Sequence, residues 1–104
     1  MKSFRGDRTI DGIVVTVDGR PLDPRFDLKA YTKNRYEWGY EGAEPTQLAF
    51  AILNEHLGDT AKAQALAPAF MRAIVANFSN EWELDGADID QAIAALAGAA
   101  ASKN

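Results

Sequence analysis

At residues 36–48 the chain reads Tyr36-Glu37-Trp38-Gly39-Tyr40-Glu41-Gly42-Ala43-Glu44-Pro45-Thr46-Gln47-Leu48. Upstream of this stretch apolar residues alternate every second position, which is typical of strands. Downstream they recur with the spacing of amphipathic helices. The aromatic residues at 36, 38 and 40 also alternate, and two glycines and a proline follow or lie among them. We therefore expect a strand over Tyr36–Tyr40 that enters a tight glycine turn and continues as a helix.

Two Asp-Gly pairs upstream favour hairpin turns. Asp11-Gly12 and Asp18-Gly19 flank Ile13-Val14-Val15-Thr16-Val17, and Asp-Gly suits a type I′ turn because both central residues need positive φ. The five residues between the pairs are all β-branched, which favours a strand. We predict a meander over Ser3–Ile10, Ile13–Val17 and Arg20–Leu22, with the second strand central and covered.

Helical periodicity and capping residues divide the second half of the chain. Pro45 favours a helix start, and Gly58 favours its end after Leu57. Asp59-Thr60 then supplies the N-cap of the next helix. Pro68 is expected to end a helix over Ala61–Ala67 and to start another that runs to Phe78. Two further features are predicted: Glu81–Leu84 as a short edge strand or an extended link, and Asp85 with Asp88 as the capping pair of a last helix.

These patterns predict the α+β class, with a small antiparallel sheet of three or four strands packed on one side by three or four helices. At 104 residues the chain is long enough for one modest core. We expect a single domain over residues 1–96 and a frayed alanine-rich tail over residues 97–104.

Composition excludes several chemistries. The chain contains no cysteine, so disulfides, thiolate metal sites and cysteine nucleophiles are absent, which fits a reducing compartment. We see no signal-peptide pattern and no apolar run long enough to span a membrane. A cytoplasmic protein without membrane contact is therefore expected.

The net charge of −4 is unevenly distributed. Residues 1–35 carry eight basic and five acidic groups, whereas the remainder carries three basic and ten acidic groups. Such asymmetry indicates either two solvated halves or an interaction surface. The acidic half offers candidate contacts to a basic protein partner at Glu41, Glu44, Glu81, Trp82 and Glu83.

The basic half supports an alternative partner, nucleic acid. Cationic side chains alternate there with aromatic ones, as in small sheets that bind single strands. An isoelectric point near 4.8 argues against it. The candidate residues are Arg5, Arg8, Arg20, Lys33 and Arg35.

Other polar groups favour structural roles. His56 is the only histidine, so a hydrogen-bonded residue near the helix C-terminus is favoured over a proton shuttle. The cluster of Asp85, Asp88 and Asp90 fits helix capping better than a calcium loop, because no distal glutamate follows. Glu41 and Glu44 would repel a phosphate from the glycine turn. We expect no metal, no cofactor and no catalytic residue; acid–base chemistry by Glu37 or Glu41 with His56 is the weakest hypothesis.

The Tyr-Glu-Trp-Gly-Tyr run, together with Pro45-Thr46-Gln47-Leu48-Ala49, resembles a family of small uncharacterised proteins, a domain of unknown function found in bacteria, phages and mobile elements. The resemblance extends from the first hairpin to the segment around Trp82. It implies a small accessory protein that binds a host or defence protein, and it brings no catalytic residues.

We therefore hypothesise a small non-enzymatic interaction module, a regulator or inhibitor encoded by a phage or mobile element. It would bind an unknown host protein through its acidic helical face or through the central loop, which is the glycine turn that carries Glu41 and Glu44. Nucleic-acid binding by the basic N-terminal sheet is the alternative.

Overall fold

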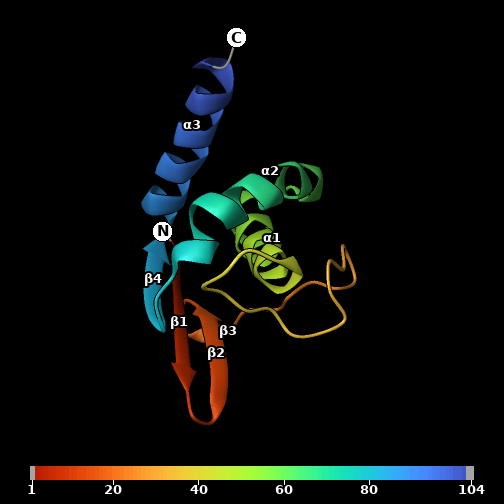
Figure 1. Ribbon diagram of the computed structural model, residues 1–104, viewed down its shortest axis with the longest axis vertical. Helices are drawn as coiled ribbons and strands as arrows, with labels where there is room; N and C mark the ends of the chain where they lie inside the picture. The colour runs from red at the N-terminus through yellow and green to blue at the C-terminus, as the bar shows by residue number, and fades with distance from the viewer. Residues whose placement is uncertain (1, 103–104) are drawn as a thin grey trace.

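The computed structural model describes residues 2–102, and in this part of the chain it contains four strands, three α-helices and one 3₁₀ helix (Figure 1). The elements are β1 (Ser3–Thr9), β2 (Gly12–Val17), β3 (Arg20–Pro21), α1 (Ala43–Leu57), α2 (Thr60–Ala73), η1 (Val75–Asn77), β4 (Glu81–Asp85) and α3 (Gly86–Ser102). The predicted α+β class is confirmed, and the described residues form three helices rather than four.

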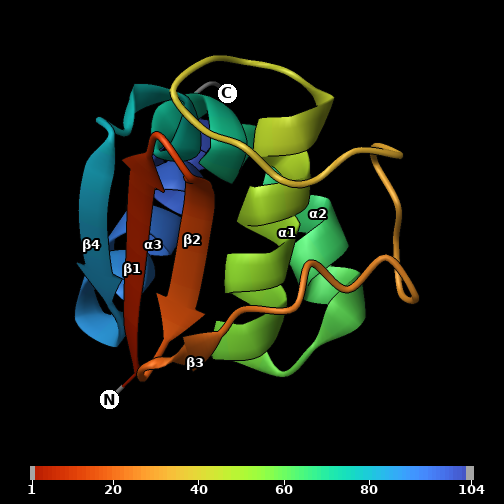
Figure 2. The same ribbon diagram turned by 90° about the horizontal axis from the view of Figure 1, so that it is seen from below.

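The sheet is antiparallel throughout, with strand order β3-β2-β1-β4 (Figure 2). The predicted meander is confirmed, and β2 lies between β1 and β3. Val15 and Val17 on one face of β2 are buried, whereas Val14 on the other face is 56% exposed. The expectation that β2 is covered therefore holds for one face only. The β-branched Val14 and Thr16 on the less buried face reflect strand propensity and not burial.

The predicted strand over Tyr36–Tyr40 is wrong, because this segment is irregular and belongs to no sheet. Its backbone amides bond to other elements: Glu37 N–H donates to the carbonyl of Glu44 at 3.3 Å, and Gly39 N–H donates to the carbonyl of Val75 at 3.1 Å. The aromatic alternation arises because Tyr36 and Trp38 are buried anchors. The fourth strand is β4, so the edge-strand interpretation of Glu81–Leu84 is confirmed.

Pro68 does not interrupt α2, which contradicts the prediction of two separate helices. A proline at this position removes the bond to the carbonyl of Gln64, four residues earlier. Both Pro68 and Gln64 are exposed, so water can satisfy that carbonyl and the helix continues. The predicted run to Phe78 also ends early, at Ala73, and η1 follows.

The predicted helix caps are confirmed. Gly58 adopts a left-handed conformation with φ of 65° and donates to the carbonyl of Asn54. Asp59 accepts a hydrogen bond from the backbone of Lys62. Asp85 and Asp88 each accept from the other's backbone N–H, at 2.8 and 3.0 Å. These contacts satisfy backbone groups that helix ends leave unpaired.

A long irregular segment, residues 22–42, crosses α1 and is held by one buried side chain of that helix. Gln47 is fully buried. Its amide nitrogen donates to the carbonyls of Pro24 and Lys29, at 2.7 and 2.9 Å, and its amide oxygen accepts from Tyr31 N–H at 2.8 Å. A single glutamine thus replaces the regular backbone pairing that the segment lacks.

The core lies between the inner face of the sheet and the helices. Phe4, Val15 and Val17 from the sheet belong to one buried cluster with Leu48 and Phe50 of α1 and with residues of α2. The last part of α3 extends away from this body (Figure 1). The frayed tail over residues 97–104 stays a prediction: α3 continues to Ser102, and residues 103 and 104 lie outside the described residues.

Substituting Gln47→Met preserves side-chain bulk but leaves Tyr31 N–H and two carbonyls without their partner. We expect the free energy of unfolding to fall by about 2–4 kcal/mol, because the three hydrogen bonds that are lost are part-buried and contribute about 0.5–1.5 kcal/mol each. Urea unfolding measures this loss. The matched control is Gln64→Met on the exposed side of α2, which should change stability by less than about 0.5 kcal/mol. Equal effects in the two variants would contradict the role assigned to Gln47.

Candidate functional site

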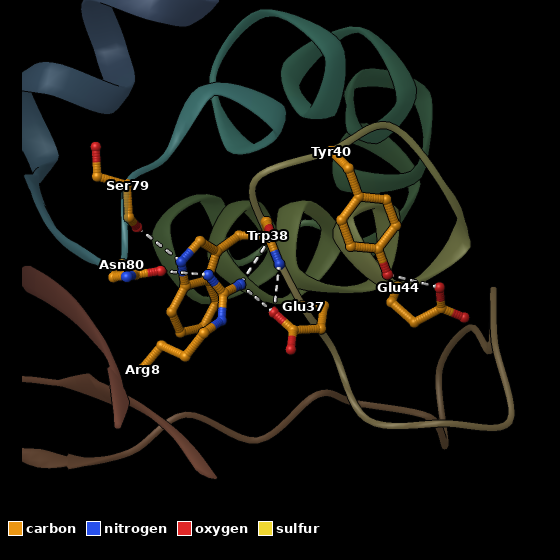
Figure 3. Close-up of polar contacts among 7 residues, drawn as sticks. All are labelled: Arg8, Glu37, Trp38, Tyr40, Glu44, Ser79 and Asn80. Carbon is orange, nitrogen blue, oxygen red and sulfur yellow. Dashed lines mark hydrogen bonds and ion pairs between the residues drawn. The ribbon is translucent and has the colours of Figure 1, made fainter. Parts of the chain in front are cut away.

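The stretch that begins at Tyr36 is bound to the sheet by Arg8 of β1 (Figure 3). The Arg8 guanidinium donates to the carboxylate of Glu37, to the Trp38 carbonyl at 2.9 Å and to the side-chain oxygen of Asn80 at 2.8 Å. It also lies over the Trp38 ring, 4.6 Å from the centroid, a favourable cation–π geometry. One side chain therefore joins β1, the irregular segment and the link before β4.

Trp38 is the centre of an aromatic cluster beneath the sheet. Its indole N–H donates to the carbonyl of Ser79 at 2.8 Å, and its ring meets Trp82 edge-on at 5.8 Å between centroids. Trp82 stacks on Phe78 at 4.2 Å. The Trp82 ring lies against Gly6, where an added Cβ would be 2.0 Å from the indole nitrogen. Gly6 is therefore required for this close packing.

The two acidic residues of the central loop, Glu41 and Glu44, differ in how far internal hydrogen bonds already occupy them. Glu44 accepts hydrogen bonds from the Tyr40 hydroxyl at 2.9 Å and from the Thr32 hydroxyl at 2.7 Å. Both bonds lower the pKa of Glu44, and the bond from Thr32 has the larger effect. Burial, followed by the bond to Glu44, raises the pKa of Tyr40 to about 12. Glu44 is thus engaged within the fold, whereas Glu41 is exposed.

A second group of acidic side chains lies on the face of the sheet that none of the helices within residues 2–102 covers (Figure 2). Strand register places Asp7 opposite Glu81, and Arg5 opposite Glu83. These four residues line a shallow hollow of about 590 Å³ together with Val14 and Thr16 of β2. Arg5 lies 3.9 Å from Glu83, and both side chains are mostly exposed. We call this surface, formed by Arg5, Asp7, Val14, Thr16, Glu81 and Glu83, the open face.

The predicted acidic contacts therefore separate into two places. Glu81 and Glu83 lie on the open face, whereas Glu41 and Glu44 lie at the start of α1. Trp82 lies between Glu81 and Glu83 in sequence, but its side chain points to the opposite side of the sheet and is only 8% exposed. Strand alternation causes this separation, since successive side chains point to opposite faces.

The predicted basic residues do not gather on one surface. Arg5 is on the open face, and Arg8 forms an ion pair with Glu37. Arg20 lies 3.4 Å from Glu55 of α1. Arg35 donates to the Ile13 carbonyl at 3.1 Å, and Lys33 is exposed. Three of these five cations are already paired with carboxylates of the chain.

The groups proposed for acid–base chemistry lie at opposite ends of α1. Glu37 bonds to the backbone of Glu44, whereas His56 is in the last turn and contacts Asp90 of α3 at 2.7 Å. Twelve residues of helix separate Glu44 from His56, a rise of about 18 Å. Within residues 2–102, no group of three or more metal-binding side chains is close enough to hold an ion, and no helix is long and apolar enough to cross a membrane.

Fold and site together define a small α+β protein in which the central motif is occupied by internal contacts and one acidic sheet face is open. A family model described as "Family of unknown function (DUF6166)" matches residues 4–95. The chain belongs to this family. Neither a curated protein nor a solved structure matches it.

Sequence reasoning missed three members of the open face: Asp7, Val14 and Thr16. Strand periodicity contained the signal for them, because Arg5 and Asp7 share one face of β1, and Val14 and Thr16 share one face of β2. The sequence alone did not predict that β1 pairs with β4, because those strands are more than seventy residues apart in sequence. Without that pairing, Asp7 cannot be placed beside Glu81.

Alkaline pH should destabilise the protein through Tyr40. Its pKa is about 12 in the folded state and 10 in the reference state. The unfolded chain therefore releases this proton first, and stability falls as the pH rises from about 10 to 12. We expect urea unfolding to lose stability more steeply with pH in this range for the wild type than for Tyr40→Phe. Tyr31 and Tyr36 are common to both proteins and cancel in the comparison. Identical slopes would contradict the assignment.

Proposed function

We propose that this protein is a small non-enzymatic interaction module that binds a positively charged protein surface through the open face of its sheet. The observation that carries the proposal is the gathering of Asp7, Glu81 and Glu83 around a shallow hollow that no helix covers. Opposing potentials guide partners together and select among them.

The charges of the open face are not balanced within the chain. Asp7 and Glu81 are direct cross-strand neighbours, and like charges at such positions destabilise a sheet. Arg5 supplies one positive charge against three carboxylates, and its contact with Glu83 is exposed and long, so it contributes little. Cations from a partner would relieve this repulsion, which makes the face a better acceptor for a basic surface than for a neutral one.

Val14 gives the open face an apolar element. It is 56% exposed and lines the hollow with Thr16. Interfaces commonly place an apolar contact within a polar rim, because the apolar area contributes binding energy and the charges select the partner. A basic partner with one aliphatic side chain among its cations would fit this surface.

The central motif is a weaker candidate for binding. Glu37, Trp38 and Glu44 are held by Arg8, Ser79, Tyr40 and Thr32, so binding through them would require breaking internal contacts. Glu41 remains exposed and is the alternative acidic contact. We further propose a regulator or inhibitor, encoded by a phage or mobile element, that acts on a host protein; the resemblance of the run from Tyr36 to Tyr40 to small accessory proteins and the acidic open face support this.

Nucleic-acid binding is the competing proposal. Of its five candidate residues, Arg8 is held by Glu37 and the Trp38 carbonyl, so the contacts would come from Arg5, Arg20, Lys33 and Arg35. An electrophoretic shift with single-stranded DNA at low salt distinguishes the two, because phosphate contacts give a steep salt dependence. A shift that Arg20→Gln and Lys33→Gln weaken would favour nucleic acid over a basic protein.

The proposed site is tested by charge reversal at two exposed glutamates. Glu83→Lys reverses a charge on the open face, and Glu41→Lys makes the same change in the central loop. A partner is first captured on the immobilised wild-type protein, identified by mass spectrometry and purified. Calorimetry should then show that Glu83→Lys weakens binding by roughly tenfold or more, whereas Glu41→Lys changes it by less than about twofold.

Two results would overturn the open-face assignment. One is equal binding by wild type and Glu83→Lys; the other is a greater loss with Glu41→Lys, which would place the contact at the central loop. Urea unfolding of both variants checks that neither substitution acts through stability.

A further inference from the structure

The structure points to a specific mode of binding: we propose that the outer edge of β4 accepts an extended basic segment of a partner protein as a fifth, antiparallel strand. This inference rests on the proposed function and specifies how its basic partner is held. It would place backbone hydrogen bonds along β4 and cationic side chains over the open face.

β4 forms the border of the sheet, next to β1 only (Figure 2). Two hydrogen bonds give the direction of its backbone groups: Arg8 N–H donates to the carbonyl of Asn80, and Gly86 N–H donates to the carbonyl of Lys2. In an antiparallel pair, residues alternate between those that bond to the neighbouring strand and those that point away. Even-numbered residues of β4 therefore face β1, and Glu81 and Glu83 direct their N–H and C=O groups outward.

The outward groups have no backbone partner among residues 2–102. The N–H of Asp85, the next odd-numbered residue, is already paired with a side chain, because it donates to the Asp88 carboxylate at 3.0 Å. This cap ends the free edge at Glu83. Unpaired groups in a strand edge are a template for an added strand, and strand addition is a common way to bind an extended peptide.

The chemistry of the open face selects the added segment. Glu81 and Glu83 present their backbone groups at the edge and their carboxylates on the open face. In a directly opposite residue, the Cβ lies about 4.5–5.5 Å away. An antiparallel segment with lysine or arginine at every second position would therefore place each cation beside one carboxylate. The residues between the cations would point toward the α3 side of the sheet.

A second copy of this chain does not fit the edge. An antiparallel β4–β4 pair centred on Glu83 would place Glu83 opposite itself and Glu81 opposite Asp85. Acidic side chains would then oppose one another at every outward position, and like charges directly opposite destabilise a sheet. The same carboxylates thus disfavour self-pairing and favour a basic strand.

Three synthetic peptides test strand addition with the full chain. The first alternates lysine and valine; the second has the same sequence with methyl groups on the lysine backbone nitrogens; the third carries them on the valine nitrogens. In the antiparallel arrangement the lysine N–H groups face β4. We expect methylation of the lysines to weaken binding at least about tenfold and methylation of the valines to change it by less than about twofold, with slower amide exchange at Glu81 and Glu83 in the complex.

A protein variant supplies a matched comparison. Glu83→Gln removes the charge, and Glu83→Pro removes the charge and the outward N–H, which β1 does not use; proline is accepted at such edge positions. Glu83→Pro should weaken the first peptide at least about threefold more than Glu83→Gln. Amide exchange across β1 and β2 confirms that the sheet is intact.

The outcomes separate the two proposals. Equal binding of all three peptides, with the loss in Glu83→Gln equal to that in Glu83→Pro, overturns strand addition and leaves the proposed acidic binding face standing. Absence of binding by every peptide at low salt overturns both.

Discussion

The fold depends on the contacts of the Arg8 guanidinium with Glu37 and Trp38. Arg8 is on the first strand, Glu37 and Trp38 are in the irregular segment before α1, and Asn80 precedes the last strand. A planar cation that stacks on an indole and donates to three acceptors can join these segments at one point. Residues 36–42 belong to no strand of the sheet, so the contacts of Arg8, the side-chain amide of Gln47 in α1 and the backbone bonds of residues 37 and 39 hold the irregular segment in place.

Internal contacts of residues 36–48 explain why this stretch, the most distinctive part of the sequence, is a poor candidate for binding. Tyr36 donates to the Leu22 carbonyl, Trp38 fills the core, Tyr40 bonds to Glu44, and Gln47 binds the backbone of the segment. Internal contacts therefore occupy these side chains, and Glu41 is the exposed carboxylate of the motif. The open face and the outer edge of β4 offer more to a partner, because carboxylates gather there and the outward backbone groups of Glu81 and Glu83 have no backbone partner among residues 2–102.

The sequence predicted correctly those elements that depend on residues close together in the chain. The β-branched run Ile13–Val17 formed its strand, and Gly58, Asp59 and Asp85 formed caps, because each depends on neighbours within a few residues. Tyr36–Tyr40 misled because buried anchors in an irregular segment can alternate as strand residues do. Pro68 misled because the cost of its missing hydrogen bond depends on solvent access. The open face required the pairing of β1 with β4, and Trp82 could not be assigned to a face before that register was known.

The contacts of Arg8 link the segments energetically and are not incidental surface contacts. A double-mutant cycle tests this link: Arg8→Met keeps an unbranched aliphatic side chain and removes the guanidinium, which lies over Trp38. Glu37→Gln removes the carboxylate charge, and urea unfolding measures each variant and the pair. We predict a coupling free energy of about 1–2 kcal/mol, above the range of ordinary exposed ion pairs. A coupling below about 0.3 kcal/mol, with additive losses, would show that Arg8 and Glu37 do not link the segments energetically.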